Sequence, residues 1–156
     1  MYKCRYFGIQ ELVSRAAYNM FGELCWQFFQ EDILKDLDIA REAWELYVRS
    51  KYPKEKVGII INNWSFGGSY NESGLRTNID SLVKSKKTVY LSAHVLACGF
   101  DLKPTNGRHE EFHTLMCNLI KQKKFKKFRR VENRKSAPTW CHLDAFRTPN
   151  DELIIF

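Results

Sequence analysis

The sequence predicts an α+β fold in which helices flank an antiparallel sheet. Two observations indicate this class. Apolar residues recur at helical spacing in the first third of the chain, and short β-forming segments interrupted by one helix fill the rest. The 156 residues suffice for one domain with a sizeable core. We therefore expect a single domain over residues 1–156, with a helical part over about 1–55 and an α+β part over about 56–156.

The N-terminal part contains two predicted helices. Residues 9–20 are typical of a short helix or helical turn. A longer helix is predicted over about 23–48, and Pro53 ends any continuation because proline lacks the backbone N–H and clashes with the preceding turn. The apolar stripe of the longer helix consists of Trp26, Phe29, Ile33, Leu37, Ala40, Trp44 and Tyr47.

The later part alternates strands with loops. Residues 57–61 are apolar and mostly β-branched, which predicts a buried strand, and the Asn-, Gly- and Ser-rich residues 62–74 predict a loop. A charged turn at 84–87 precedes a predicted strand at 88–92. Apolar residues at helical spacing predict a helix over about 108–122. The remaining predicted strands are residues 128–133, 139–145 and 153–156.

Composition excludes disorder and a disulfide scaffold. Hydrophobic residues make up 44% of the chain and aromatic residues 14%, so a packed core is expected. Five cysteines are an odd number with no C-x-x-C pair, which favours reduced thiols. No secretory signal and no apolar stretch of membrane-spanning length is visible. We expect a soluble protein that is cytoplasmic as synthesised.

Positive charge is concentrated near the C-terminal third. Residues 121–135 contain nine Lys or Arg and one Glu, in a chain with a formal net charge of +7. Such a run attracts polyanions such as nucleic acid, anionic membrane or acidic wall polymer, and Phe125 and Phe128 could stack on bases. The preferred interpretation is a solvated helix end and turn, with both phenylalanines in the core.

Three residues form a candidate metal site. His94 and Asp101 are separated by six residues that are all apolar or small. Residues 89–91 are β-forming, so we expect His94 at a strand end and Gly99 to let the backbone turn and return Asp101 to its side. His142, in another β-like run, is the third candidate. Two histidines and an aspartate with one open position are the ligands of a catalytic Zn²⁺.

These motifs resemble those of the zinc-dependent D-Ala-D-Ala carboxypeptidase family. The shared patterns are Ser-x-His-(six residues)-Asp at 92–101, Trp-x-His at 140–142, and Ser-Gly-aromatic-Arg-Ser/Thr at 73–77, where Leu75 replaces the aromatic residue. The family includes vancomycin-resistance dipeptidases and several phage endolysins, and it shares its fold with the hedgehog signalling domain. The stretch at 62–68 and the opening of the chain resemble a phage-borne branch, so the resemblance covers most of the sequence.

The resemblance implies a hedgehog-like zinc peptidase fold and a hydrolase that cleaves peptidoglycan stem peptides. The bond would be D-Ala-D-Ala or L-alanyl-D-amino acid. It implies that His94, Asp101 and His142 hold Zn²⁺ and that Arg76 pairs with a carbonyl oxygen or carboxylate of the substrate. It also implies a phage or prophage lysis role, with release to the cell wall through another factor and retention on anionic wall polymer by residues 121–135.

The general base departs from the family pattern. Many members carry Glu or Asp three residues before the second histidine, and Thr139 stands there in this chain. Glu132 ends the preceding strand, where the hedgehog-like branch also carries a glutamate. Asp144 shares a strand face with His142 and could act on the water or support a ligand. Glu132 is the preferred base.

Two other groups of residues offer metal ligands. Residues 109–113 read His-Glu-Glu-Phe-His, a literal H-E-x-x-H zinc signature. They fall in the first turn of a predicted helix, where acidic residues also complement the helix dipole, and no third ligand follows. Cys98 and Cys141 could be soft zinc ligands. On a strand, however, Cys141 would point away from His142, so packing is the preferred role.

Two further differences bear on activity. Members usually have Gly four residues before the Asp and Ala two before it, and here Ala97 and Gly99 exchange these places. The missing acid at Thr139 leaves open a zinc-binding structural or wall-binding module without catalysis. The basic run at 121–135 leaves open a nucleic-acid-binding protein, although this is the less favoured interpretation.

Overall fold

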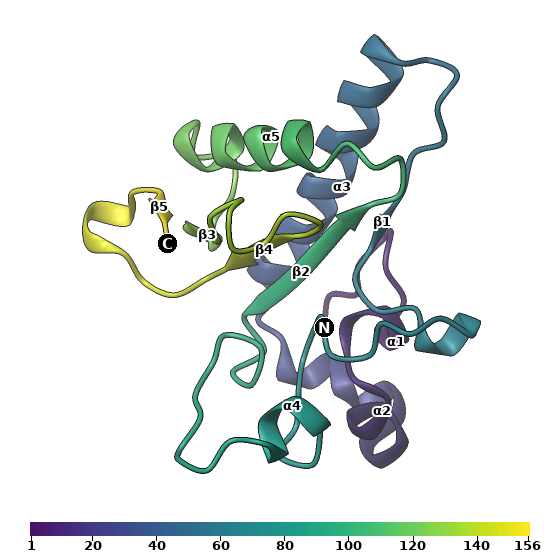
Figure 1. Ribbon diagram of the computed structural model, residues 1–156, viewed down its shortest axis with the longest axis vertical. Coiled ribbons are helices and arrows are strands. Elements are labelled where there is room, and N and C mark those ends of the chain that lie inside the picture. Colours follow the sequence, from purple (N-terminus) through teal and green to yellow (C-terminus); the bar gives the residue numbers. More distant parts are fainter.

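The computed structural model describes residues 1–156 and has a mixed α+β architecture (Figure 1). The α-helices are α1 (Ile9–Leu12), α2 (Arg15–Phe21), α3 (Glu31–Lys51), α4 (Ser81–Lys84) and α5 (His109–Lys121). The strands are β1 (Ile59–Ile60), β2 (Gly99–Pro104), β3 (Arg130–Val131), β4 (Cys141–Asp144) and β5 (Ile154–Ile155). Short 3₁₀ helices occupy Gly22–Phe28, Trp64–Phe66 and Pro149–Asp151.

The five strands form one sheet in the order β1-β2-β4-β3-β5. Every neighbouring pair is antiparallel except β3 and β5, which run parallel. In the central pair, Asp101 of β2 lies opposite His142 of β4, and Gly99 lies opposite Asp144. The predicted α+β class with a mainly antiparallel sheet is confirmed at this level.

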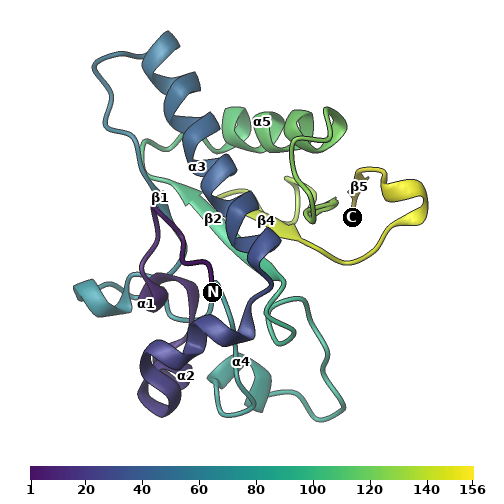
Figure 2. The same ribbon diagram turned by 180° about the vertical axis from the view of Figure 1, so that it is seen from behind.

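The two faces of the sheet differ in chemistry because successive side chains on a strand point to opposite sides. Phe100, Leu102 and Leu143 are buried on the face that α3 and α5 cover (Figure 2). The rings of Phe100 and Phe29 lie 5.8 Å apart, which ties β2 to the segment before α3. The alternate residues, Asp101 and His142 among them, point to the other face. The core therefore fixes the backbone from which the polar face projects.

A single cluster of 30 buried apolar residues runs from Phe7 to Leu143. Trp44 of α3 packs edge-on against Phe112 of α5, with ring centroids 5.1 Å apart. Buried Asp36 of α3 accepts hydrogen bonds from the backbone N–H groups of residues 126–128, at 2.8, 2.7 and 3.1 Å. None of the helices is both long enough and apolar enough to span a membrane.

The two N-terminal helix predictions are correct in kind and wrong in extent. The predicted helix at 9–20 is divided because Val13 forms a bridge with Leu75, and Ser14 then caps α2 by accepting the N–H of Ala17 at 3.2 Å. The helix predicted from residue 23 starts only at Glu31, after the 3₁₀ turn. Extended backbone at Phe29 ends that turn, so tertiary packing overrides the apolar periodicity.

The strand predicted at 88–92 is wrong. This segment has no regular structure, and the side chains of Val89 and Leu91 are 89% and 67% exposed. β-forming residues stabilise a strand only where a neighbour pairs with it and covers one face, and this segment has neither. The other predicted strands are present but shorter, and the helix predicted at 108–122 is confirmed as α5. The interior strand β2 was not predicted as a strand.

Candidate metal centre

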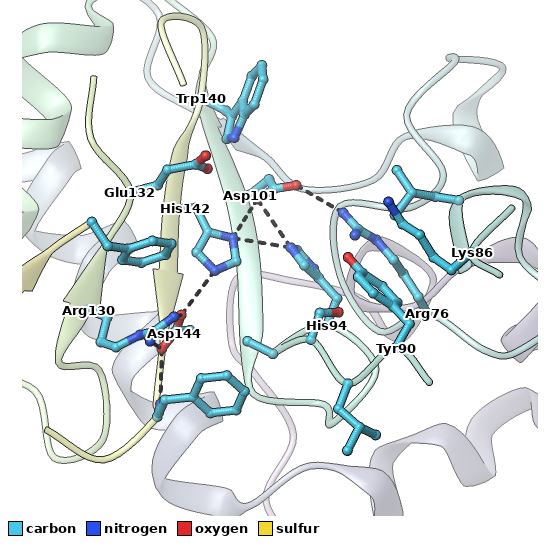
Figure 3. A pocket seen from close by; sticks show the side chains of 16 residues that line it. Arg76, Lys86, Tyr90, His94, Asp101, Arg130, Glu132, Trp140, His142 and Asp144 are labelled. Atoms are coloured by element: carbon cyan, nitrogen blue, oxygen red, sulfur yellow. Dashed lines mark hydrogen bonds and ion pairs between the residues drawn. The ribbon is translucent and has the colours of Figure 1, made fainter. Parts of the chain in front are cut away.

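His94, Asp101 and His142 meet at the polar face of the sheet (Figure 3). Each offers one ligand atom, and these atoms lie within 4.8 Å of one another. Nδ1 of His142 is 2.8 Å from Oδ1 of Asp101, and Nε2 of His94 is 3.2 Å from that Nδ1 and 3.4 Å from that Oδ1. Three buried or half-buried side chains thus converge on one point, and the group could hold a metal ion.

Strand pairing itself brings two of the three ligands together. Asp101 and His142 are directly opposite each other across β2 and β4, so both side chains leave the same face at neighbouring positions. His94 comes from a turn at residues 93–97, which the N–H of Cys98 closes by donating to the C=O of Ala93 at 2.8 Å. The expectation that His94 ends a strand is therefore wrong, although its place beside Asp101 is as predicted.

Close packing between this turn and β2 requires glycine at position 99. A Cβ there would lie 2.5 Å from Cβ of Ala93 and 3.2 Å from Cε1 of His142. Gly99 is extended strand backbone, so it does not make the turn that we expected of it. The reversal occurs at Ala97, whose φ of 55° is left-handed. Gly99 instead allows the turn that carries His94 to lie against the sheet.

The second ring nitrogen of each histidine has a partner that fixes the tautomer. Nδ1 of His94 is 2.9 Å from the carbonyl oxygen of Gly74, which can only accept, so Nδ1 carries the hydrogen and Nε2 presents its lone pair. Nε2 of His142 is 3.3 Å from Oδ2 of Asp144, which favours the hydrogen on Nε2 and a lone pair on Nδ1. Nε2 of His94 and Nδ1 of His142 then both face Asp101, so the donor set fits a metal ion.

Asp144 is fully engaged in holding His142. Its carboxylate is buried and receives the guanidinium of Arg130 at 3.0 Å through both Nε and Nη2, and the backbone N–H of Phe146 at 3.0 Å. Burial opposes its charge, but the hydrogen bonds from His142 and Arg130 keep the pKa of Asp144 below the ordinary carboxyl value. Asp144 therefore supports a ligand and has no oxygen free for another partner.

The three side chains of the centre influence one another's pKa values. Burial disfavours the charge of Asp101, yet its contacts with His142 and His94 hold the pKa of this carboxyl well below its usual value. Burial also opposes the charge of His142, but hydrogen bonds to Asp101 and Asp144 raise the pKa of His142 to about 9. Burial lowers the pKa of His94. In the protein without metal, His142 therefore holds a proton between two carboxylates, and a metal ion that binds Nδ1 must displace it.

Glu132 stands beside the three ligands from the neighbouring strand segment. Its N–H donates to the carbonyl oxygen of His142 at 3.2 Å, which places both side chains on the same face of the sheet. The carboxylate is half-buried, lines the cavity over the ligands and makes no hydrogen bond or ion pair (Figure 3). Of the two acids considered as general base, Glu132 is the one with free oxygens.

Arg76 forms the opposite side of this cavity of about 440 Å³ (Figure 3). Its Nη2 lies 3.5 Å from Oδ2 of Asp101, and its Nε donates to the carbonyl oxygen of Glu72. The side chain is only 10% exposed, so the guanidinium is held at a fixed place on the cavity wall. Residues of the wall that the sequence motifs did not indicate are Lys86, Tyr90, Arg130, Phe146 and Phe156. Only Arg130 carried a signal, because it stands two residues before Glu132 on the same strand face.

The H-E-x-x-H segment does not form a metal site. Nε2 of His113 is 3.0 Å from the carbonyl oxygen of Glu132, and Nδ1 is 3.8 Å from Sγ of Cys117. Glu111 is held by Tyr47, Tyr52 and Arg108. No third ligand converges on His109 and His113. His113 and Glu111 are instead engaged with neighbouring side chains and backbone.

Neither cysteine near the ligands joins the centre. Cys141 is buried and, as predicted, faces the core, where burial raises the pKa of its thiol well above the ordinary value. Burial also raises the pKa of Cys98, to about 11. A thiol binds metal as the thiolate, so these raised pKa values oppose ligation. The group that could hold a metal ion is confined to His94, Asp101 and His142.

The basic run is part core and part surface. Phe125 and Phe128 are buried with ring centroids 5.6 Å apart, so they are not available to stack on bases. This is the placement that the preferred interpretation predicted.

A scan of protein-family models, a search of curated proteins and a search of solved structures found no match for this chain.

Proposed function

We propose that this chain is a zinc-dependent peptidase that hydrolyses peptidoglycan stem peptides, with a fold of the hedgehog and D-Ala-D-Ala carboxypeptidase type. One observation carries the proposal. Nε2 of His94 and Nδ1 of His142 converge on the carboxylate of Asp101, and a separate acceptor orients each ring. The motif resemblance described above supplies the substrate class. Both the D-Ala-D-Ala carboxypeptidase and the L-alanyl-D-amino-acid endopeptidase activities fall within it.

His94, Asp101 and His142 would hold the zinc ion, and Asp144 would keep His142 oriented toward it. Zinc bound by three such ligands supplies a Lewis acid that polarises the scissile carbonyl and makes water nucleophilic near neutral pH. The proton that His142 holds in the metal-free protein would leave on binding, so metal affinity should rise with pH through the pKa of about 9.

Glu132 is the proposed general base. A base needs an oxygen that is not already occupied and that lies within reach of the reacting water. Glu132 meets the first condition and lines the cavity above the ligands, whereas both oxygens of Asp144 are bound to neighbours. Glu132 would take a proton from the attacking water and pass it to the leaving amine.

Arg76 is the proposed substrate-binding cation. Its guanidinium contacts Asp101 through Nη2 and Glu72 through Nε, which leaves Nη1 free at the cavity wall. A guanidinium stays charged at all working pH values and can bind a carbonyl oxygen or a carboxylate in a fixed direction.

The proposal includes a role as a phage endolysin that acts on the cell wall after release.

Turnover of purified muropeptides tests this function. We expect zinc-loaded protein to cleave a stem peptide at one of the two proposed bonds, and Glu132→Gln to lower kcat at least ~10²-fold while zinc is retained. Glu110→Gln is the matched control, because Glu110 is exposed and is the base that the H-E-x-x-H alternative would use. Asp144→Asn should instead weaken zinc affinity by roughly 10–100-fold.

Thr139 favours a second candidate, a zinc-binding module of the same fold without catalysis. An acid is usual at this position, and the threonine here is exposed. Stoichiometric zinc without cleavage of either bond would replace the peptidase by this module. If Asp144→Asn lost more turnover than Glu132→Gln at equal zinc content, Asp144 would replace Glu132 as the proposed general base.

A further inference from the structure

A second cavity, of about 640 Å³, lies on the far side of Phe146 from the metal centre. Its lining residues come from the start of α3, the turn before β2, the connection between α5 and β3, and the segment after β4. Phe146 is the one residue that lines both cavities. None of the metal ligands, nor Arg76 or Glu132, lines the second one. It is therefore a separate site and plays no part in the proposed hydrolysis.

The lining of this cavity is strongly positive. Lys126, Lys127, Arg129 and Arg147 contribute four cations, and Asp151 contributes the one carboxylate. A concave surface lined by charges of one sign concentrates the electrostatic potential and attracts ions of the opposite sign. The basic run is thus not evenly spread over the surface, because three of its residues are gathered here with an arginine from outside the run.

Arg129 is built into the wall. Its Nη1 donates to the carbonyl oxygens of Phe125 and Phe128 at 3.0 and 2.9 Å, and its Nη2 donates to the carbonyl oxygen of Lys126 at 3.0 Å. The side chain is 15% exposed. Its Nε is buried without a hydrogen-bond partner, and the nearest carboxylate oxygen is Oδ1 of Asp151 at 3.8 Å. Arg129 is therefore a fixed positive charge in the cavity wall, and it attracts an anion even though its Nε is not exposed to the cavity.

The lysines project from an equally rigid frame. Asp36 binds the backbone N–H groups of Lys126 and Lys127 at 2.8 and 2.7 Å, which anchors this connection to α3. Nζ of Lys126 is 3.4 Å from Asp32, and neither Lys127 nor Arg147 has a side-chain hydrogen bond or ion pair. Two of the four cations are therefore free to meet a ligand, and their backbone positions are set before it arrives.

Apolar side chains complete the cavity, and they decide what kind of anion fits. Ile33, Leu96, Ala145 and Phe146 form part of the lining beside the cations. The volume exceeds what one inorganic anion needs, and apolar walls favour a carbon skeleton. We propose that this cavity binds the phosphate group of an organic phosphate, with Lys127, Arg129 and Arg147 on the phosphate oxygens.

Two sources carry this chemistry: a phosphodiester-linked wall polymer and a small polyol phosphate. The first source, and only that one, rests on the proposed action at the cell wall. Nucleic acid fits less well, because the phenylalanines of the basic run are buried and a single cavity does not follow an extended phosphate backbone. The phosphate site itself does not depend on peptidase activity.

Calorimetric titration with glycerol 3-phosphate and with poly(glycerol phosphate) tests the site on the full chain. The variant Lys126→Gln/Lys127→Gln/Arg147→Gln removes three charges from the formal +7, leaving +4. The matched control Lys121→Gln/Lys124→Gln/Lys135→Gln leaves the same +4 and changes exposed residues of the same run outside the cavity. We expect Kd to rise at least ~10-fold in the cavity variant and less than ~2-fold in the control. An equal rise in Kd in both variants would overturn the proposed site and indicate that the net positive charge of the surface attracts the ligand.

Asp151→Asn tests the same site without removing a cation. It deletes the one opposing charge beside Nε of Arg129, and asparagine tolerates the left-handed backbone at this position. Phosphate affinity should rise several-fold, and an unchanged or weaker affinity would contradict the proposal. Binding by the polymer alone, or by both ligands, supports the site, and binding by the polymer alone identifies the wall polymer as the source. A DNA oligonucleotide of matched charge that binds as tightly as the polymer would overturn it.

Phosphate binding by Asp101→Asn separates this inference from the proposed function. That variant removes a proposed metal ligand and leaves the cavity lining intact. We expect its affinity for glycerol phosphate to equal that of the wild type. The phosphate site would then remain supported even if no peptidase activity were found. Loss of phosphate binding in Asp101→Asn would show that the two sites are not separate.

Discussion

At the scale of single residues, the chemistry of the metal centre is set by partners of the ligands. Gly74 and Asp144 decide which nitrogen of each histidine is free, and Arg130 holds Asp144 in place. The motifs predicted the three candidate ligands and Arg76 because a motif consists of given residue types at given spacings. The partners could not be predicted in the same way, since a contact such as His94 with the Gly74 carbonyl depends on how two loops pack.

Arg76→Lys tests the role of the guanidinium. We expect the variant to keep its zinc and to lose about 10²-fold in kcat/KM on muropeptides, because an ammonium group cannot hold Asp101 and a substrate oxygen in two fixed directions. Arg49→Lys, on the exposed part of α3, is the control and should be neutral. Wild-type turnover by Arg76→Lys, measured on the same substrate, would remove Arg76 from the mechanism.

At the scale of elements, the largest error concerns the strand beside His94. Residues 88–92 have β-forming side chains and no partner strand. In contrast, β2 is an interior strand although Gly99, Asp101, Lys103 and Pro104 are poor strand formers. Pairing with β4 on one side and β1 on the other overrides that composition. Single-sequence patterns predicted the buried, strongly periodic α5 well, because its own apolar stripe decides its position.

Gly99→Ala tests how closely the ligand turn packs on β2. The new methyl group would lie 2.5 Å from Cβ of Ala93, so the turn carrying His94 must move. We expect a loss of about 1–3 kcal/mol in the free energy of unfolding, measured with urea, and weaker zinc binding. Adding Ala93→Gly should restore part of both, because it removes the opposing methyl group.

Ala97→Gly is the control for this element. Relief of left-handed strain at φ 55° is offset by the lost methyl group and the greater freedom of the unfolded chain, so stability should change by less than about 1 kcal/mol and zinc should stay bound. Unchanged stability and zinc affinity in Gly99→Ala would show that the turn is not held against the sheet as described.

At the scale of the whole molecule, the two faces of the sheet have different roles. The apolar face and the helices make the core, and the other face presents the candidate metal centre. Its parts come from distant positions, as the separation of 48 positions between His94 and His142 shows. The class of the fold was predictable because it follows from the order and period of apolar segments. The order of strands was not, since every pairing in the sheet is long-range.

Asp36→Ala tests the connection between α3 and the basic run. Three backbone N–H groups lose their acceptor, and each unsatisfied buried donor costs on the order of 1–3 kcal/mol. We expect the unfolding free energy to fall by about 3 kcal/mol. Asp32→Ala, which breaks only ion pairs with Lys126 and Lys35 at 3.4 and 3.8 Å, should cost less than about 1 kcal/mol. Equal losses in the two variants would show that Asp36 has no special place in the fold.

The most direct test of the central claim is the zinc content of the purified protein by elemental analysis. The account predicts about one zinc per chain in the wild type, and loss of zinc in each of His94→Ala, Asp101→Ala and His142→Ala. His109→Ala and His113→Ala should retain it, because neither residue belongs to the ligand group. A wild type without zinc, or zinc that is lost only in the His109 and His113 variants, would contradict the claim that these three residues form the metal centre.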